Sequence, residues 1–199
     1  ISMIMLICTW VVYSKLSYLQ KRDNGFDPHP VLIVTVNTGQ DERSKITTMD
    51  NDFRSLADVK MVGSGNCYPG NPNFGFDLFR IQTDSGYIDK AIECYAIDEN
   101  FLPTLHISVV KGRNFSGLSD TLHSIVVNEA MVKHFGWKEA IGKRVKFAGD
   151  TSSDYFEVVG VIKDFNQESL YNPIAPLLMF YRPNGNLIQV KMSTGDLKT

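Results

Sequence analysis

The run GSGNCYPGNPNFG at residues 63–75 constrains the fold most strongly, because the hydrophobic pattern changes across it. Glycine, proline and asparagine favour turns, so a long loop is expected here. Upstream, residues 31–36 (VLIVTV) form an unbroken apolar run, which is typical of a strand buried on both faces. Downstream, apolar and polar residues alternate, which is typical of strands with one wet face. We therefore expect two lobes that meet near this loop.

The upstream part contains one helical stripe between two strands. Ile46, Met49, Phe53 and Leu56 recur at helical spacing, and a short strand is expected at residues 59–64. This order of elements is a β-α-β unit. Its two strands are expected to be parallel or to be neighbours in one sheet.

The downstream part reads as a series of short strands with one helix. A turn at residues 84–86 predicts a hairpin between residues 79–83 and 88–96. Asn128 is a good helix cap, and the helix is expected to run to Phe135 and end at Gly136. Further strands are expected near residues 124–127, 144–147, 155–163, 177–181 and 187–192.

The first thirteen residues (ISMIMLICTWVVY) carry no charge. As a helix they would span ~20 Å, against ~30 Å for the core of a bilayer. Aromatic and then basic residues follow, in the order expected at a membrane–water boundary. We interpret the segment as the outer end of a transmembrane helix. The predicted membrane-anchoring residues are Ile4, Leu6, Ile7, Trp10 and Val11. The alternative is an amphipathic helix that packs on the core of its own domain.

Charge and cysteine content exclude some classes of protein. A net charge of -2 gives no reason to expect nucleic acid as a partner. The basic residues between Lys133 and Lys146 are opposed only by Glu139, and we interpret them as a solvated face. Three cysteines form no disulfide framework. A bridge between Cys67 and Cys94 stays open, since an oxidising compartment would permit it.

No catalytic motif accounts for the chain. The histidines show no zinc-site spacing, and neither a nucleophile elbow nor a phosphate-binding loop is present. Asp164 and Glu168 lie four residues apart, a spacing that would suit an acid–base pair on a helix. A predicted strand precedes them and two prolines follow, so we interpret the segment as a polar turn. No enzyme activity, metal site or cofactor is predicted, and a hydrolase using this pair is the rival hypothesis.

Five segments in order resemble the extracytoplasmic domain of the MacB-like/FtsX-like ABC transporter permeases, particularly those of Bacteroidetes. They are YLQKRDNGFD (residues 18–27), VLIV (31–34), VVKGRNFS (109–116), IVVNEAMVKHFGWKEAIGKRV (125–145) and VVGVIKDFNQESLYNPIAPLL (158–178). The positions that match the family motifs are read as turn, cap and packing residues. They are Gly112, Arg113, Asn128, Gly136, Gly142, Asp164, Phe165 and Pro176.

The resemblance implies an α+β fold, the two-lobed MacB-like periplasmic core domain. Its α/β lobe is built from both ends of the chain, and a β-rich lobe is inserted between them. On this basis residues 1–24 are the end of a transmembrane helix with its periplasmic extension, and residues 25–66 begin the α/β lobe. Residues 67–163 form the inserted lobe. Residues 164–199 complete the α/β lobe, which stops short of the family pattern.

The resemblance also implies a function without chemistry. The domain would face the periplasm from the bacterial inner membrane and couple ATP-driven motion to substrate or partner handling, as in efflux or mechanotransmission. It would act through a cytoplasmic ATPase subunit and as a homodimer in the full transporter, with the lobes moving about their breaker-rich joints. Tyr68, Phe74 and Tyr87 are candidates for a partner surface. The alternative is a peptide- or ligand-sensing module of a related permease.

Overall fold

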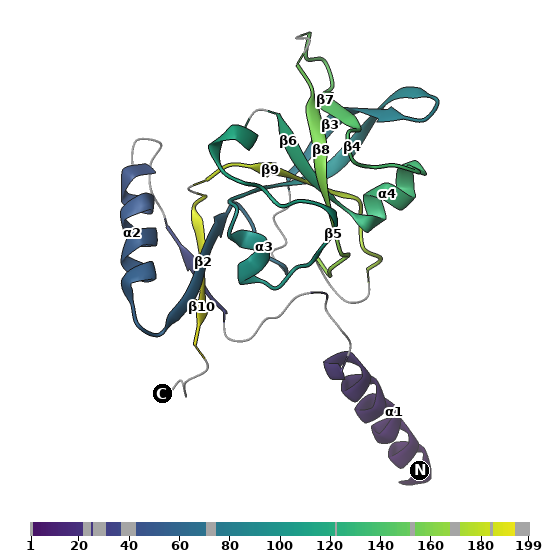
Figure 1. Ribbon diagram of the computed structural model, residues 1–199. Coiled ribbons are helices and arrows are strands. Elements are labelled where there is room, and N and C mark those ends of the chain that lie inside the picture. The colour runs from purple at the N-terminus through teal and green to yellow at the C-terminus, as the bar shows by residue number, and fades with distance from the viewer. Residues whose placement is uncertain are drawn as a thin grey trace.

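A computed structural model describes residues 2–21, 25, 31–36, 43–70, 75–121, 123–151, 154–167, 172–183 and 185–193. The fold is α+β, as predicted, and rich in strands (Figure 1). The helices are α1 (Ser2–Lys21), α2 (Arg43–Ser55), α3 (Phe101–Thr104), α4 (Glu129–Phe135) and the short 3-10 helix η1 (Leu118–Asp120). The strands are β1 (Val31–Thr35), β2 (Val59–Gly65), β3 (Gly75–Thr83), β4 (Gly86–Ile97), β5 (Val109–Gly112), β6 (Ser124–Asn128), β7 (Arg144–Phe147), β8 (Phe156–Ile162), β9 (Leu177–Tyr181) and β10 (Leu187–Met192).

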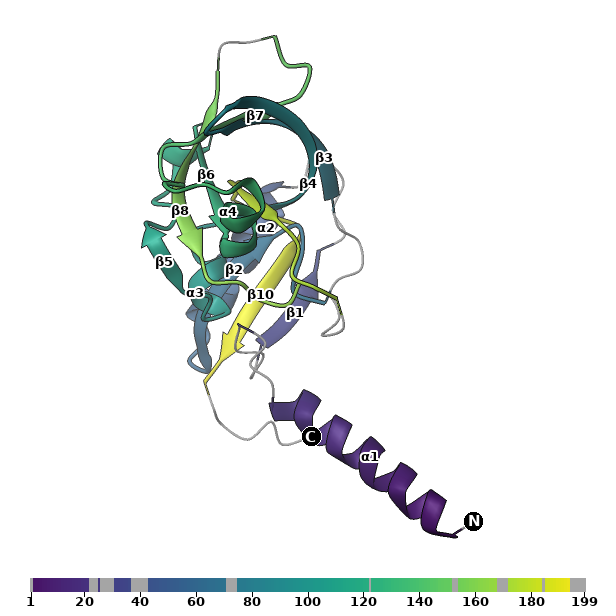
Figure 2. The same cartoon turned by 90° about the vertical axis from the view of Figure 1, so that its right-hand side faces the viewer.

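Six strands close into a barrel, whose curvature is visible along β3 and β7 (Figure 2). Around the ring the order is β3, β4, β9, β6, β8 and β7, and β7 pairs with β3 again. The interior is strongly aromatic. Phe147 and Phe180 stack with their ring centroids 5.6 Å apart, and Phe79 and Phe156 pack against them. Closure by mutual pairing removes the exposed sheet edges that these six strands would otherwise present.

The outer face of the same sheet carries a second core. Successive residues of β9 point to opposite sides, so Leu178 and Phe180 belong to the interior core while Met179 and Tyr181 belong to the outer one. Helix α3 and the segment after it cover this outer face, with Phe101 fully buried. The barrel wall is therefore hydrophobic on both faces, which explains why β6 and β9 are buried along their whole length.

The α/β lobe consists of β1, β10 and β2 with α2 on one face (Figure 1). Both β1 and β2 run antiparallel to β10, so they are parallel to each other in one sheet, as predicted, with β10 between them. The prediction that residues 31–36 are buried on both faces is wrong. Leu32 is 54% exposed and Ile33 is 38% exposed, because β1 pairs only with β10 within the described strands and forms an edge of the sheet.

The two lobes are connected through closely packed backbone. Gly65 of β2 pairs with Ile97 at the end of β4. A Cβ atom built on Gly63 would come within 2.9 Å of the backbone of Phe101, and one on Gly185 would overlap the backbone of Gly65. The assignment of residues 25–66, 67–163 and 164–199 to separate parts stays a prediction. The pairing of β9 with β4 and β6 favours a return to the α/β lobe after β9, at about residue 182.

Helix α1 stands clear of both lobes in the two views (Figures 1 and 2). All its described side chains from Met3 to Lys15 are exposed, and Trp10 and Tyr13 are about 70% exposed. None of the helices in the described part of the chain combines the length and the apolar character needed to cross a bilayer.

Candidate functional site

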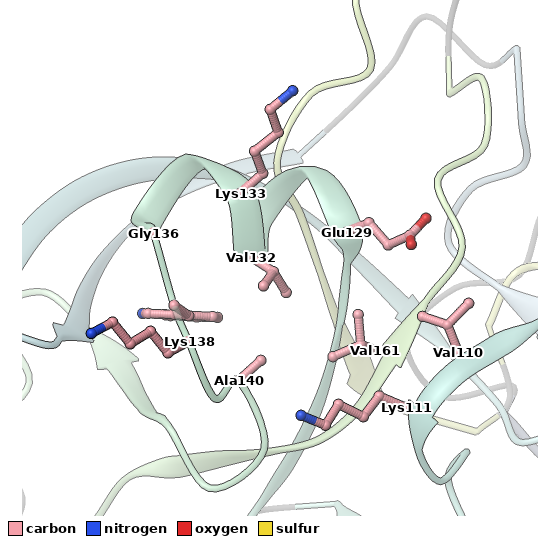
Figure 3. A pocket seen from close by; sticks show the side chains of 10 residues that line it. Val110, Lys111, Glu129, Val132, Lys133, Gly136, Lys138, Ala140 and Val161 are labelled. Carbon is pink, nitrogen blue, oxygen red and sulfur yellow. The ribbon is translucent and has the colours of Figure 1, made fainter.

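A hollow of about 560 Å³ lies beside helix α4, and we call it the α4 groove (Figure 3). Side chains from β5, β8, α4 and the segment after α4 line it. They are Val110, Lys111, Glu129, Val132, Lys133, Gly136, Trp137, Lys138, Ala140 and Val161. The volume falls within the ~300–1,000 Å³ that is usual for ligand sites. The predicted helix and Gly136, which ends it, therefore border an apolar hollow on the barrel.

Local sequence signals position α4. Asn128 has an extended backbone conformation, and its side-chain oxygen accepts the amide hydrogen of Met131 at 3.0 Å. Gly136 ends the helix in the left-handed conformation, with φ of 63°. Asn128 also bonds the start of β9 and the segment before it, since it accepts from the amide of Leu177 and donates to the carbonyl of Ala175. One buried amide therefore fixes both the start of α4 and its position against β9.

The floor of the groove is apolar. Val132, Ala140 and Val161 point toward one another across the hollow (Figure 3). Trp137 forms one wall and is held firmly, because its ring nitrogen donates to the carbonyl of Gln82 at 2.8 Å and its ring stacks on Phe135. Contacts within the chain therefore fix the position of this wall.

Three lysines and two glutamates surround this floor. Lys111 forms an ion pair with Glu139 at 2.8 Å, and both side chains are more than half exposed. Glu129 accepts a hydrogen bond from the backbone amide of Asp164 at 3.1 Å. The side chains of Lys133 and Lys138 form no ion pair or hydrogen bond within the described part of the chain. The rim therefore holds two ammonium groups whose charge is not directly neutralised.

Asp164 contributes to the position of α4. Its carboxylate accepts the amide hydrogen of Ala130 at 2.8 Å, in the first turn of α4. Burial raises the pKa of this carboxyl group above its usual value, while the bond from Ala130 and the nearby Lys133 lower it. Glu168, the other half of the suspected acid–base pair, lies outside the described residues. What the structure describes of this segment is a contact between the turn after β8 and the start of α4.

The other motif positions lie in turns and in the core. Gly112 has φ of 74°, and a Cβ there would overlap the carbonyl of Val159. Gly142 has φ of 84°. Phe165 is fully buried in the outer core, and Pro176 is partly buried just before β9. Arg113 forms an ion pair with Asp120, a partner that the sequence did not indicate.

The remaining predicted residues lie away from the α4 groove. Tyr87 is 46% exposed on β4 and its ring lies 6.0 Å from that of Tyr155. Tyr68 is partly buried after β2, and Phe74 lies outside the described residues. Cys67 and Cys94 are both free thiols. Among the described residues, no three His, Cys, Asp or Glu side chains come together as a metal site.

Sequence reasoning identified the lysines of the groove but not its floor. The basic residues after α4 stood out as a run, whereas Val110, Val132 and Val161 come from three elements whose proximity depends on long-range pairing. The sequence shows the pattern of apolar and polar residues within each element, but it does not show that these three elements lie side by side.

The fold is α+β and contains a closed barrel, and comparisons place it in a known class. The model of the MacB-like periplasmic core domain matches residues 2–197. The chain therefore belongs to the MacB-like periplasmic core domain family of ABC transporter permeases. None of the curated proteins compared with the sequence matches it.

Three solved structures share the fold. One is the periplasmic region of MacB from Actinobacillus actinomycetemcomitans, at 15% identity and a TM-score of 0.58, covering 91% of this chain and 82% of that one. Another is a domain of a putative permease protein from Porphyromonas gingivalis, at 15% identity and a TM-score of 0.55, covering 83% and 75%. The third is the extracellular domain of the noncanonic ABC-type transporter YknZ from Gram-positive bacteria, at 16% and 0.55, covering 83% and 85%.

Proposed function

We propose that this chain is the periplasm-facing domain of an ABC-type permease in the bacterial inner membrane. It would pass ATP-driven motion from a cytoplasmic ATPase subunit to a substrate or partner protein outside the membrane, as in efflux or mechanotransmission. Two copies would act together in the full transporter, and the domain would carry out no covalent chemistry. Membership of the MacB-like family supports this proposal, as does the likeness to periplasmic and extracellular domains of transporters.

The proposal that this domain is attached to a membrane rests on one observation, the exposure of the apolar side chains of α1. Ile4, Leu6 and Trp10 are each more than 65% exposed, and Ile7 and Val11 are also exposed. A helix that is apolar on all sides needs an apolar environment around it, whereas a surface helix concentrates its apolar residues on one face. This favours lipid contact over the alternative of packing on the core of the domain. We infer that these five residues meet the membrane.

The joint between the lobes determines how motion would pass through the domain. The sequence suggested that the lobes move about breaker-rich joints, but the glycines of this joint allow close packing. Gly63 of β2 lies against the start of α3, and Gly65 at the end of β2 pairs with Ile97 at the end of β4. Packed backbone without space for a Cβ resists hinge bending. We therefore propose that both lobes move as one body when α1 moves.

Distance measurements between the two copies in the full permease test this proposal. Leu118 is 77% exposed on η1, so a spin label at Leu118→Cys would not disturb the core. The exposed Cys8 and the partly exposed Cys94 would be replaced by serine first. We expect the label-to-label distance between copies to differ between the nucleotide-free and the vanadate-trapped transporter. A second pair of labels, at Asn51→Cys and Leu118→Cys within one copy, should keep its distance.

Two results would contradict parts of the proposal separately. Identical distances between copies in both nucleotide states would exclude the transmission of motion to this domain. A change within one copy would instead show that the lobes move relative to each other. A transporter with an ATPase subunit that cannot bind ATP is the control, and its distances should stay at the nucleotide-free values.

The size of the α4 groove favours ligand sensing as the second candidate function. A sensor would bind a small ligand saturably and become more stable against heating as the ligand concentration rises. The coupling function requires no such response from the isolated chain. Thermal unfolding in the presence of candidate peptides therefore separates the two functions.

A further inference from the structure

We propose that the α4 groove binds a short extended segment of a partner polypeptide, with one large apolar side chain between acidic residues. The proposal rests on the proposed function in one respect, namely that the domain meets a partner protein outside the membrane. It goes further by assigning the place of contact and the chemistry of the segment.

The shape of the groove supports an apolar anchor. Val110 is 51% exposed at the mouth of the groove, although it belongs to a strand that pairs with the barrel. Val161 is almost completely buried below it, and Trp137 forms a wall that two contacts already hold in place. An aliphatic side chain entering here would cover apolar surface at about 25 cal/mol per Å² without ordering the floor first.

The charge on the rim supports acidic neighbours for that anchor. Lys133 points away from the floor toward solvent (Figure 3), and Lys138 is an exposed residue that also lines the groove. The ion pair of Lys111 with Glu139 is exposed on both sides, so a carboxylate of the partner can compete for it at little cost. Glu129 is already engaged by the amide of Asp164. The rim carries three lysines against Glu129 and Glu139, which is a small excess of positive charge in a chain whose net charge is -2.

The edge of β5 favours a polypeptide over a small amphiphile. Among the described strands β5 pairs only with β8, so its other edge is not paired with a strand. The pairing of β5 with β8 shifts register between Val109 and Lys111, as at a β-bulge. At this point the neighbouring residues Val110 and Lys111 both line the groove. Strand β5 is only four residues long, contains a lysine and has a bulge. These features protect its edge against pairing with a long strand of another chain. A main chain of two or three residues can still both donate to and accept from this edge, while the alkyl chain of a fatty acid can do neither.

The test is a titration of the 15N-labelled 199-residue chain, kept in solution with dodecyl maltoside and followed by amide chemical shifts. The probe is the acetylated and amidated hexapeptide Asp-Glu-Ile-Leu-Asp-Glu. We expect saturable shifts confined to amides of β5, α4 and the segment after α4, with a Kd of about 1 mM or tighter. The basic peptide Lys-Lys-Ile-Leu-Lys-Lys should shift these amides at least tenfold more weakly, and high salt should weaken the acidic peptide.

Matched variants separate local charge from net charge. Lys133→Glu with Lys138→Glu should weaken binding at least tenfold. Lys60→Glu with Lys90→Glu changes the net charge equally at exposed positions on β2 and β4, and should leave binding unchanged. Val110→Asp, at a half-exposed position, should also abolish binding. Unchanged circular dichroism and melting temperature of each variant would show that folding is intact.

Several results would overturn the proposal. They are an absence of shifts at about 1 mM peptide, equal binding of acidic and basic peptides, and shifts centred away from α4 and β5. Binding of decanoate to the same amides without binding of the peptide would identify a site for amphiphiles instead. Because this experiment needs neither the ATPase nor the second copy, its failure would leave the distance measurements on the transporter unaffected. Likewise, failure of the distance measurements would leave the peptide-binding proposal unaffected.

Discussion

Two arginine–aspartate pairs of nearly the same geometry have different surroundings in this molecule. In the first, Arg113 donates two hydrogen bonds to the carboxylate of Asp120, at 2.8 and 2.9 Å. The Asp120 carboxylate is buried and also accepts from the amide of Ser116 and the hydroxyl of Ser124. In the second, Arg80 donates two hydrogen bonds to Asp89 at the same two distances, but both side chains are more than 40% exposed.

Replacing the two aspartates measures what burial adds to such a pair. We expect Asp120→Asn to lower the free energy of unfolding by about 2 kcal/mol, because charge-assisted bonds to a buried acceptor are lost. The value lies at the low end for a broken buried pair since the side chain of Arg113 is half exposed. Asp89→Asn, with the same geometry at the surface, should cause a much smaller change. Urea unfolding of both variants checks this, and equal losses would contradict it.

The contribution of the Asp120 carboxylate to stability also depends on pH. The Arg113 guanidinium holds the pKa of the Asp120 carboxyl well below its usual range. Its contribution to stability is therefore complete above the unfolded pKa of about 4 and is lost as the pH falls through the folded pKa. The sequence did not indicate this cluster. Asp120 stands in a polar stretch that reads as a loop, and only the fold shows that its carboxylate is buried.

At the level of elements, local signals predicted the helices well but did not predict the order of the strands in the sheet. The stripe through Ile46, Met49 and Phe53 and the cap at Asn128 each determine a helix from residues that are close in the sequence. Whether a strand is central or at an edge depends instead on distant partners. Residues 31–36 have the composition of a central strand, yet β1 is at an edge because residues 187–192 pair with it on one side only.

Asp98 joins three elements at the connection between the lobes. It follows β4, and its carboxylate accepts from the amide and hydroxyl of Ser64 in β2 at 2.9 and 3.1 Å. The other oxygen accepts the amide of Phe101 at the start of α3, at 2.8 Å. Burial raises the pKa of this carboxyl group to about 6, although the hydrogen bonds from Ser64 and Phe101 lower it.

This pKa predicts that the junction is less stable at neutral pH than at mildly acidic pH. The unfolded group titrates near pH 4, so the folded chain binds the proton more tightly between about pH 4 and pH 6. The free energy of unfolding should therefore fall as the pH rises through this range, by up to about 3 kcal/mol, and this contribution should be constant above it.

Comparison with Asp98→Asn isolates the effect from other titrating groups. Asparagine does not ionise, so the stability of the wild type relative to this variant should fall between pH 4 and pH 7. Denaturant unfolding at four or five pH values gives both profiles. Parallel profiles would contradict this, because they would show that the pKa of Asp98 is the same in the folded and the unfolded chain and that its hydrogen bonds balance its burial.

On the scale of the whole molecule, the change in hydrophobic pattern at residues 63–75 predicts two lobes but not how the strands on either side are joined. Strand β4 was expected as one arm of a hairpin, and it also pairs with β9 and touches β2. These pairings connect residues that are far apart in the chain, and no local pattern encodes them. The overall α+β architecture was predicted from the resemblance to a known family, because patterns within single segments could not predict it.

The two lobes have cores of unequal size. The α/β lobe buries one small cluster, in which Val36, Ile46, Val62, Ile188 and Val190 are the buried members. The barrel wall separates two larger clusters, and β6 and β9 contribute to both. Local opening requires less energy where fewer apolar contacts are broken and where a strand lies at a sheet edge. The α/β lobe should therefore open without disrupting the barrel.

Amide hydrogen exchange tests this difference directly. After correction for intrinsic rates, we expect amides in residues 31–36 and in α2 to exchange at least tenfold faster than those in residues 124–128 and 177–181. A tenfold ratio corresponds to about 1.4 kcal/mol in opening free energy. Measurements at two pD values establish that exchange reports equilibrium opening. Equal opening free energies in both regions would show that the packed joint makes the two lobes one cooperative unit. In that case, the small core of the α/β lobe would be stabilised by the barrel.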